Sequence, residues 1–196
     1  SVVPKTTQRL EDSLKRKNVE YTELSLKNSP ISVSYDTPET LGMDRLAASI
    51  GATRLHANQE YFTHAVVIDA GTAITCDVVD THKKIFKGGA ILAGLDMIAM
   101  ALRNRTSMLT CIDFEATEAS SYPGKTSAES LRCGISSQIN GGLELLIERF
   151  EKTLEKGEHI EIIITGGAAR SIKISRIHRH KPDLVFIGLK EIFMKS

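Results

Sequence analysis

The sequence predicts an α/β fold, and three observations lead to this class. Short apolar runs rich in β-branched residues, which are typical of buried strands, occur at 65–68, 73–80 and 160–165. The segment 127–156 places apolar residues three or four positions apart, as a helix with one buried face does. Strand and helix patterns alternate from 65 to 196, and this alternation is typical of an α/β domain.

The composition excludes several classes of protein. Of the 196 residues 41% are hydrophobic and 25% are charged, which excludes wholesale disorder. The net charge of +1 argues against a nucleic acid or a membrane surface bound mainly by electrostatics. No apolar stretch reaches the roughly 18–20 residues that a membrane span needs. Cys76, Cys111 and Cys133 form no C-x-x-C pair, so we expect inert core thiols and a cytoplasmic protein.

The first 62 residues are polar and mixed, unlike the apolar runs that follow them. We expect a helix from about Lys5 to Lys17 and an extended run from Val19 to Leu26. Thr37-Pro38-Glu39 indicates a helix start, because a hydroxyl cap precedes a proline at the first helical position. The buried face of that helix is expected to carry Leu41, Leu46, Ala47 and Ile50.

A strand, a glycine turn and a second strand are expected next. The apolar run Ala65–Ile68 ends in Asp69-Ala70-Gly71-Thr72, and the β-branched run Ala73–Asp80 follows directly. After Gly94 the apolar spacing again predicts a helix, whereas 104–123 has the pattern of an irregular segment.

The C-terminal part contains the longest predicted helix, Ser127–Lys156, with Gly157 as its stop. Ile160–Thr165 follows as a buried strand, and the turn Gly166-Gly167 leads into a short helix. The apolar run Leu184–Ile187 is expected to form a last strand before a C-terminal helix fragment.

Two glycine turns have residue types suited to a phosphorylated ligand. At 69–72 small residues let backbone N–H groups approach a phosphate, Thr72 adds a hydroxyl, and Asp69 can bind an accompanying cation. Gly166-Gly167 joins a buried strand to a helix N-terminus, which favours anions. An ordinary hairpin turn and an ordinary strand-to-helix connection remain the alternatives.

A third element pairs an acid with a base near a predicted helix start. Asp44 can accept a proton from a substrate hydroxyl, and Arg45 can bind a substrate carboxylate in a bidentate way. The alternative is an acidic residue favoured in a first helical turn, with Arg45 on the solvated face.

Five motifs occur in a characteristic order. They are L-G-M-D-R at 41–45, I-D-A-G-T-A-I-T-C-D-V-V-D at 68–80, G-G-A-I-L-A-G-L at 88–95, P-G-K-T-S-A-E-S-L-R-C-G-I at 123–135 and I-I-I-T-G-G-A-A at 162–169. Together they closely resemble type III pantothenate kinases, of the actin-like, sugar-kinase and Hsp70 ATPase superfamily. The resemblance implies an actin-like (ribonuclease H-like) two-lobe fold, with 1–62 as the remainder of an incomplete N-terminal lobe and 63–196 as the C-terminal lobe.

The resemblance also implies a function, which is ATP-dependent phosphorylation of pantothenate, the first step toward coenzyme A. In it Asp44 is the proton acceptor, and Asp69 binds the monovalent cation (potassium or ammonium) that is needed besides Mg²⁺. Ser127 stands where the family has a threonine that reaches the substrate across a homodimer interface. The residues that match the pantothenate site are Tyr35, Gly42, Met43, Asp44, Arg45 and Ser127. Those that match the ATP site are Gly71, Thr72, Gly166 and Gly167.

One family motif, the phosphate-binding D-x-G-N-[TS], does not occur in the sequence. We therefore expect little or no kinase activity from this chain alone. The alternative functions are a non-catalytic regulatory or scaffolding relative of the same family, and another kinase of the same superfamily.

Overall fold

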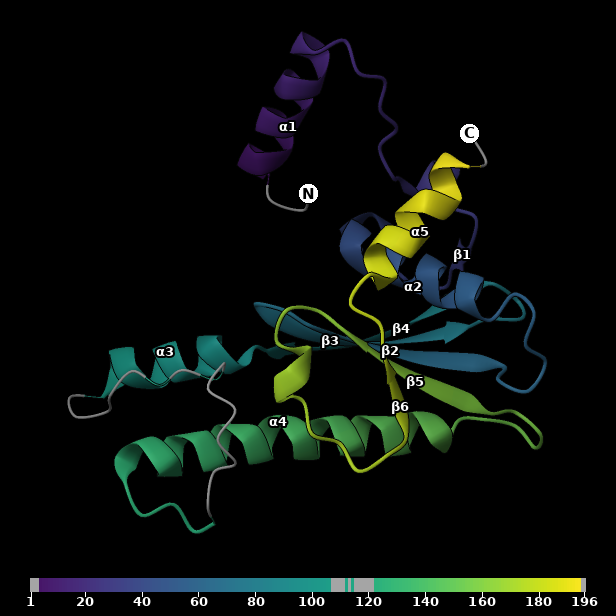
Figure 1. Ribbon diagram of the computed structural model, residues 1–196. Coiled ribbons are helices and arrows are strands. Elements are labelled where there is room, and N and C mark those ends of the chain that lie inside the picture. Colours follow the sequence, from purple (N-terminus) through teal and green to yellow (C-terminus); the bar gives the residue numbers. More distant parts are fainter. Residues whose placement is uncertain (1–3, 107–111, 113, 115–121, 195–196) are drawn as a thin grey trace.

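The computed structural model describes residues 4–106, 112, 114 and 122–194 (Figure 1). It is built from helices (α), short 3-10 helices (η) and strands (β). In chain order they are α1 Pro4–Arg16, η1 Leu26–Asn28, β1 Ser32–Val33, η2 Pro38–Thr40, α2 Met43–Leu55, β2 His64–Ala70, β3 Ala73–Asp80, β4 Ile85–Ala93, α3 Leu95–Arg105, α4 Ser127–Glu151, β5 Ile160–Thr165, η3 Ala169–Ser171, β6 His178–His180 and α5 Leu184–Phe193.

A six-stranded mixed sheet organises the fold, with the strand order β1-β4-β3-β2-β5-β6. β2, β3 and β4 form an antiparallel meander, so the predicted strand-turn-strand around Gly71 is confirmed. β5 runs parallel to β2, β6 parallel to β5, and β1 parallel to β4. The predicted α/β class is confirmed, and the mixed sheet is consistent with the actin-like architecture.

Helices cover both faces of the sheet (Figure 1). On one face α4 packs through buried isoleucine and leucine side chains four positions apart, which are Ile135, Ile139, Leu143 and Ile147. On the other face lies α2, whose Ala48 and Ala52 pack against the odd-numbered residues of β2. α5 packs against α2 on that same face.

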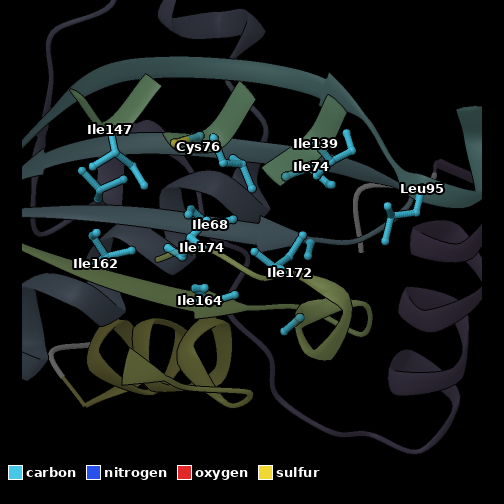
Figure 2. Packing of buried hydrophobic residues seen from close by; sticks show 14 of the residues in the cluster. Ile68, Ile74, Cys76, Leu95, Ile139, Ile147, Ile162, Ile164, Ile172 and Ile174 are labelled. Atoms are coloured by element: carbon cyan, nitrogen blue, oxygen red, sulfur yellow. The ribbon is translucent and has the colours of Figure 1, made fainter. Parts of the chain in front are cut away.

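Figure 2 shows the larger core cluster, which lies between the sheet and α4. Ile68 and Ile74 point into it from the central hairpin, and Ile164 points into it from β5. Full burial of each such side chain contributes about 1.5–3 kcal/mol to folding. Cys76 is part of this core, and burial raises the pKa of its thiol to about 12, as expected for an inert thiol.

The expected strand at Leu184–Ile187 is wrong, because this run begins helix α5. A four-residue apolar run fits either a strand or a buried helix, so its neighbours decide. Here Gly188 lies against the backbone of Ala47, where a Cβ atom would overlap the Ala47 carbonyl oxygen. This close approach lets α5 pack on α2 as a helix.

Three other boundaries differ from the predicted ones. The long helix ends at Glu151, because Thr153 directs both its N–H and its hydroxyl to the Phe150 carbonyl. Thr37-Pro38-Glu39 starts η2, and the α-helix begins only after the extended residue Gly42. Leu26, expected to end an extended run, begins η1 instead, and residues 19–25 have no regular secondary structure.

The helices predicted after Lys5 and after Gly94 are confirmed as α1 and α3. The segment expected to be irregular, 104–123, is described only in part, and Cys111 lies outside the described residues. Cys133, on α4, is half-buried. In the ranges 4–106 and 122–194, no helix combines the length and the apolar character needed to cross a membrane.

Candidate functional site

The candidate site begins at the carboxyl ends of two parallel strands. Asp69 lies near the end of β2 and pairs in register with Thr165, the last residue of β5. The glycine turns 71–72 and 166–167 follow these two strands, so they lie at the same edge of the sheet. Ligands of open α/β sheets bind at edges of this kind.

Gly166 brings the second turn against the first strand. Its backbone has a φ of +92°, in the left-handed region, and a Cβ atom there would overlap Asp69 Oδ1. Next to it, the Ala168 N–H donates a hydrogen bond to the Ala70 carbonyl over 2.9 Å. The two turns therefore form one rigid unit around the Asp69 carboxylate.

A cavity of about 1000 Å³ opens beside these turns. Gly71, Thr72 and Gly167 lie in its wall, as three of the four residues predicted to bind ATP. The rest of the wall combines apolar side chains of α3 with the acidic Asp96, the polar Asn104 and Ser171, and the cationic Arg170. Bare backbone, a hydroxyl and a guanidinium suit a polyphosphate, while the apolar side suits a flat base.

Asp44 and Asp69 interact electrostatically on the face of the sheet that α2 covers. Asp44 lies in the first turn of α2, where its Oδ1 accepts a hydrogen bond from the Arg45 N–H over 2.9 Å. Burial raises the pKa of Asp69 above its usual value, and the negative charges of Asp44 and Asp77 raise it further. The predicted proton acceptor and the predicted cation ligand are therefore electrostatic neighbours.

Arg45 lies inside the protein, with 7% of its surface exposed. Its Nε donates to both carboxylate oxygens of Asp77 over 3.1 Å, and its Nη2 donates to Asp77 Oδ1. Burial lowers the pKa of Arg45, but its interactions with Asp77 and, to a smaller extent, with Tyr35 together raise it more, so the guanidinium is charged. The alternative that placed Arg45 on a solvated face is wrong. Its contact with a substrate carboxylate stays a prediction.

Tyr35 and Met43, two further predicted substrate residues, flank this pair. The Tyr35 ring packs edge-on against Phe86, with 6.0 Å between centroids, and the Arg45 guanidinium carbon lies 6.0 Å from the Tyr35 centroid. Met43 and Asp44 lie in the wall of a second cavity, of about 550 Å³, between α1, α2 and α5. Tyr35, Gly42, Met43, Asp44 and Arg45 thus form one group.

Ser127 is the one predicted substrate residue that lies elsewhere. It is the first residue of α4 and borders a different cavity, of about 580 Å³, together with Lys125. Thr126 caps this helix, since its side chain accepts a hydrogen bond from the Glu129 N–H over 3.1 Å. Within the described residues of one chain, Ser127 does not join the group around Asp44.

The donors at the site fit a cation only in part. Among the residues that the structure describes, no group of three or more His, Cys, Asp or Glu side chains is arranged to hold a metal ion. The raised pKa of Asp69 reflects a buried carboxylate among like charges, which a bound cation would relieve. Asp69 would therefore share a cation with ligands from a bound molecule or from water.

Sequence reasoning missed Asp77, although the sequence contained a signal for it. The run Ala73–Asp80 predicts a buried strand, and an acidic residue inside such a strand needs a cationic partner. The partner, Arg45, is 32 positions away in sequence, so only the packing of α2 identifies it. Arg170 was missed as well, and its place after the glycine turn gave no distinct signal.

Comparison with known proteins shows the family to which the chain belongs. A family model described as type III pantothenate kinase matches residues 1–149. The chain belongs to the type III pantothenate kinase family. It is similar to the type III pantothenate kinase of Legionella pneumophila (strain Paris), with 35% identity over 161 residues that cover 82% of this chain and 60% of that protein. The enzyme of Frankia alni is 30% identical over 168 residues, which cover 85% and 63%.

The fold is also similar to that of a solved structure. A Campylobacter jejuni protein named for the Baf family of transcriptional activators superposes with a TM-score of 0.57 and 24% identity, over 95% of this chain and 78% of that one. The matched region spans about 60% of the length of the Legionella relative.

Proposed function

We propose that this chain carries the active site of a kinase that transfers the γ-phosphoryl group of ATP to the primary hydroxyl of pantothenate. The observation that carries the proposal is the cavity of about 1000 Å³ that Gly71, Thr72 and Gly167 border, at the edge of the sheet where the charge of Asp44 acts on Asp69. Asp44 itself borders the second cavity, of about 550 Å³. Membership of the pantothenate kinase family supports the choice of substrates. Phosphoryl transfer depends on positioning and charge neutralisation, which this edge of the sheet can supply.

The reaction assigns one role to each element of the site. ATP occupies the large cavity, with its phosphates against the backbone of 71–72 and 166–167 and the Thr72 hydroxyl. The pantothenate hydroxyl oxygen forms a bond to the γ-phosphorus while the bond from that phosphorus to ADP breaks. Asp44 takes the hydroxyl proton. A carboxylate is a sufficient base, because the proton leaves late when the transition state is loose.

The remaining parts of the proposal concern ions, a second subunit and the cellular setting. The nucleotide would carry Mg²⁺, and Asp69 would hold a monovalent cation that offsets phosphate charge. A homodimer partner brings Ser127 of one chain to the substrate of the other, which is compatible with the position of Ser127 outside the Asp44 group. The cytoplasm is the proposed location.

Formation of 4'-phosphopantothenate from ATP and pantothenate tests the proposal. The assay compares this chain with a fusion in which a relative supplies a D-x-G-N-[TS] element. We expect turnover only in the fusion, and Asp44→Asn there should lower kcat by about 100-fold or more while leaving ATP affinity within threefold. Glu39→Gln, an exposed acid just before α2, is the control and should retain full activity. Unchanged turnover in Asp44→Asn would refute the assignment of the base.

A further inference from the structure

Asp77 is a buried carboxylate that the proposed mechanism does not use. It lies on β3, on the face that α2 covers, and only 1% of its surface is exposed. Its oxygens accept hydrogen bonds from Nε and Nη2 of Arg45. The other terminal nitrogen of Arg45, Nη1, takes no part in this ion pair.

The sheet is shaped to hold this carboxylate. Gly89 on β4 is the register partner of Asp77, and a Cβ atom at position 89 would overlap Asp77 Oδ1 and the Cys76 carbonyl. Any larger residue at 89 would press on both this carboxylate and the backbone of β3. The Phe86 ring, also on β4, lies 5.5 Å from the guanidinium carbon of Arg45 and limits its movement from another side.

We propose that Asp77 is a positioning residue, which holds the Nε–Nη2 edge of Arg45 so that the Nη1 edge receives the substrate carboxylate. This inference rests on the proposed function. A guanidinium has five N–H donors in a fixed plane, so binding one carboxylate along one edge leaves donors for a second along the next. Asp77 would thereby orient the cation that distinguishes pantothenate from an uncharged analogue.

Two ligands that differ only at the carboxylate test this role. Pantothenate carries the carboxylate, and panthenol carries an alcohol in its place. Calorimetric titration of the unaltered chain and of Asp77→Asn should show at least about a tenfold loss of affinity for pantothenate, and a change below threefold for panthenol. Equal losses for both ligands, or no loss for pantothenate, would overturn the inference.

The matched control is Asp80→Asn. Asp80 is an equally buried carboxylate on the same strand, but it pairs with His64 over 3.7 Å and with Lys83. Its replacement should leave the affinity for both ligands within threefold, even if thermal stability falls. A pantothenate-selective loss in Asp80→Asn as well would show that the effect of Asp77→Asn is a general consequence of a damaged strand.

A measurement without ligand separates this inference from the proposed function. The Arg45 Nε–H signal, identified by its loss in Arg45→Lys, should exchange with water at least tenfold faster in Asp77→Asn than in the unaltered chain. Unchanged exchange would overturn the positioning role. If the unaltered chain binds no pantothenate, the proposed function fails for this chain, and so does the part of the inference that concerns the substrate carboxylate. The exchange rates would still decide whether Asp77 holds Arg45 in place.

Discussion

Replacing Arg45 with methionine should destabilise the protein far more than the same change at an exposed arginine. Arg45→Met leaves Asp77, which is 1% exposed, without its cation and without its hydrogen-bond donors. Removing one partner of a buried ion pair lowers the free energy of unfolding by about 3–5 kcal/mol. Arg54→Met on the same helix removes a pair with Glu191 in which the Arg54 side chain is 54% exposed, and should cost less than about 1 kcal/mol.

Urea unfolding followed by circular dichroism measures both losses, and its pH dependence adds a second check. Burial raises the folded-state pKa of Asp77 and the negative charge of Asp44 raises it further, so removing the hydrogen bonds and charge of Arg45, which lower it, moves this pKa still higher above the value of the unfolded chain. Stability linked to such a group is present below the unfolded pKa and is lost as pH rises through the folded pKa. The loss in free energy of unfolding of Arg45→Met, relative to the unaltered chain, should therefore grow from about pH 4 to pH 8. Equal losses at both arginines, or a deficit independent of pH, would refute the role assigned to the buried pair.

Three further results follow from burial. Leu143→Ala should lower the free energy of unfolding by about 2–5 kcal/mol in the same assay. Leu145→Ala, at a site 48% exposed, should lower it by under about 1 kcal/mol. Similar losses in the two variants would contradict the packing of α4. Burial lowers the pKa of His64 below 6.5, so stability should fall as pH drops from 7 to 5, and His64→Gln should flatten that slope. An alkylating reagent should label half-buried Cys133 before Cys76, because burial raises the pKa of the Cys76 thiol to about 12. Peptide mass measures the order of labelling, and early labelling of Cys76 would contradict its burial.

The elements that sequence reasoning predicted best are those in which local pattern and tertiary packing agree. β2 and β3 carry apolar and β-branched residues around one glycine turn, so no distant contact was needed to foresee the hairpin. Leu184–Ile187 has the same local pattern as a strand, but its structure depends on the close approach of Gly188 to α2. That contact joins segments about 140 residues apart, which periodicity cannot reveal.

The same distinction applies to the candidate site. Asp69 and Gly71 could be singled out because a turn of small residues after a buried strand has a chemical meaning of its own. The connection between Asp44 and Asp69 depends on α2 lying across the sheet, and the pairing of Arg45 with Asp77 depends on the same placement. Charge alone suggested that Arg45 could bind an anion, but it could not show that a protein carboxylate occupies one edge of the guanidinium.

Amide chemical-shift mapping tests most directly whether nucleotide and pantothenate meet at the carboxyl ends of β2 and β5. A non-hydrolysable ATP analogue with Mg²⁺ should shift the amide signals of Gly71, Thr72 and Gly167, which border the cavity of about 1000 Å³. Pantothenate, added next, should shift those of Asp44 and Arg45. Shifts confined to other surfaces, for either ligand, would contradict the assignment of this edge as a kinase site.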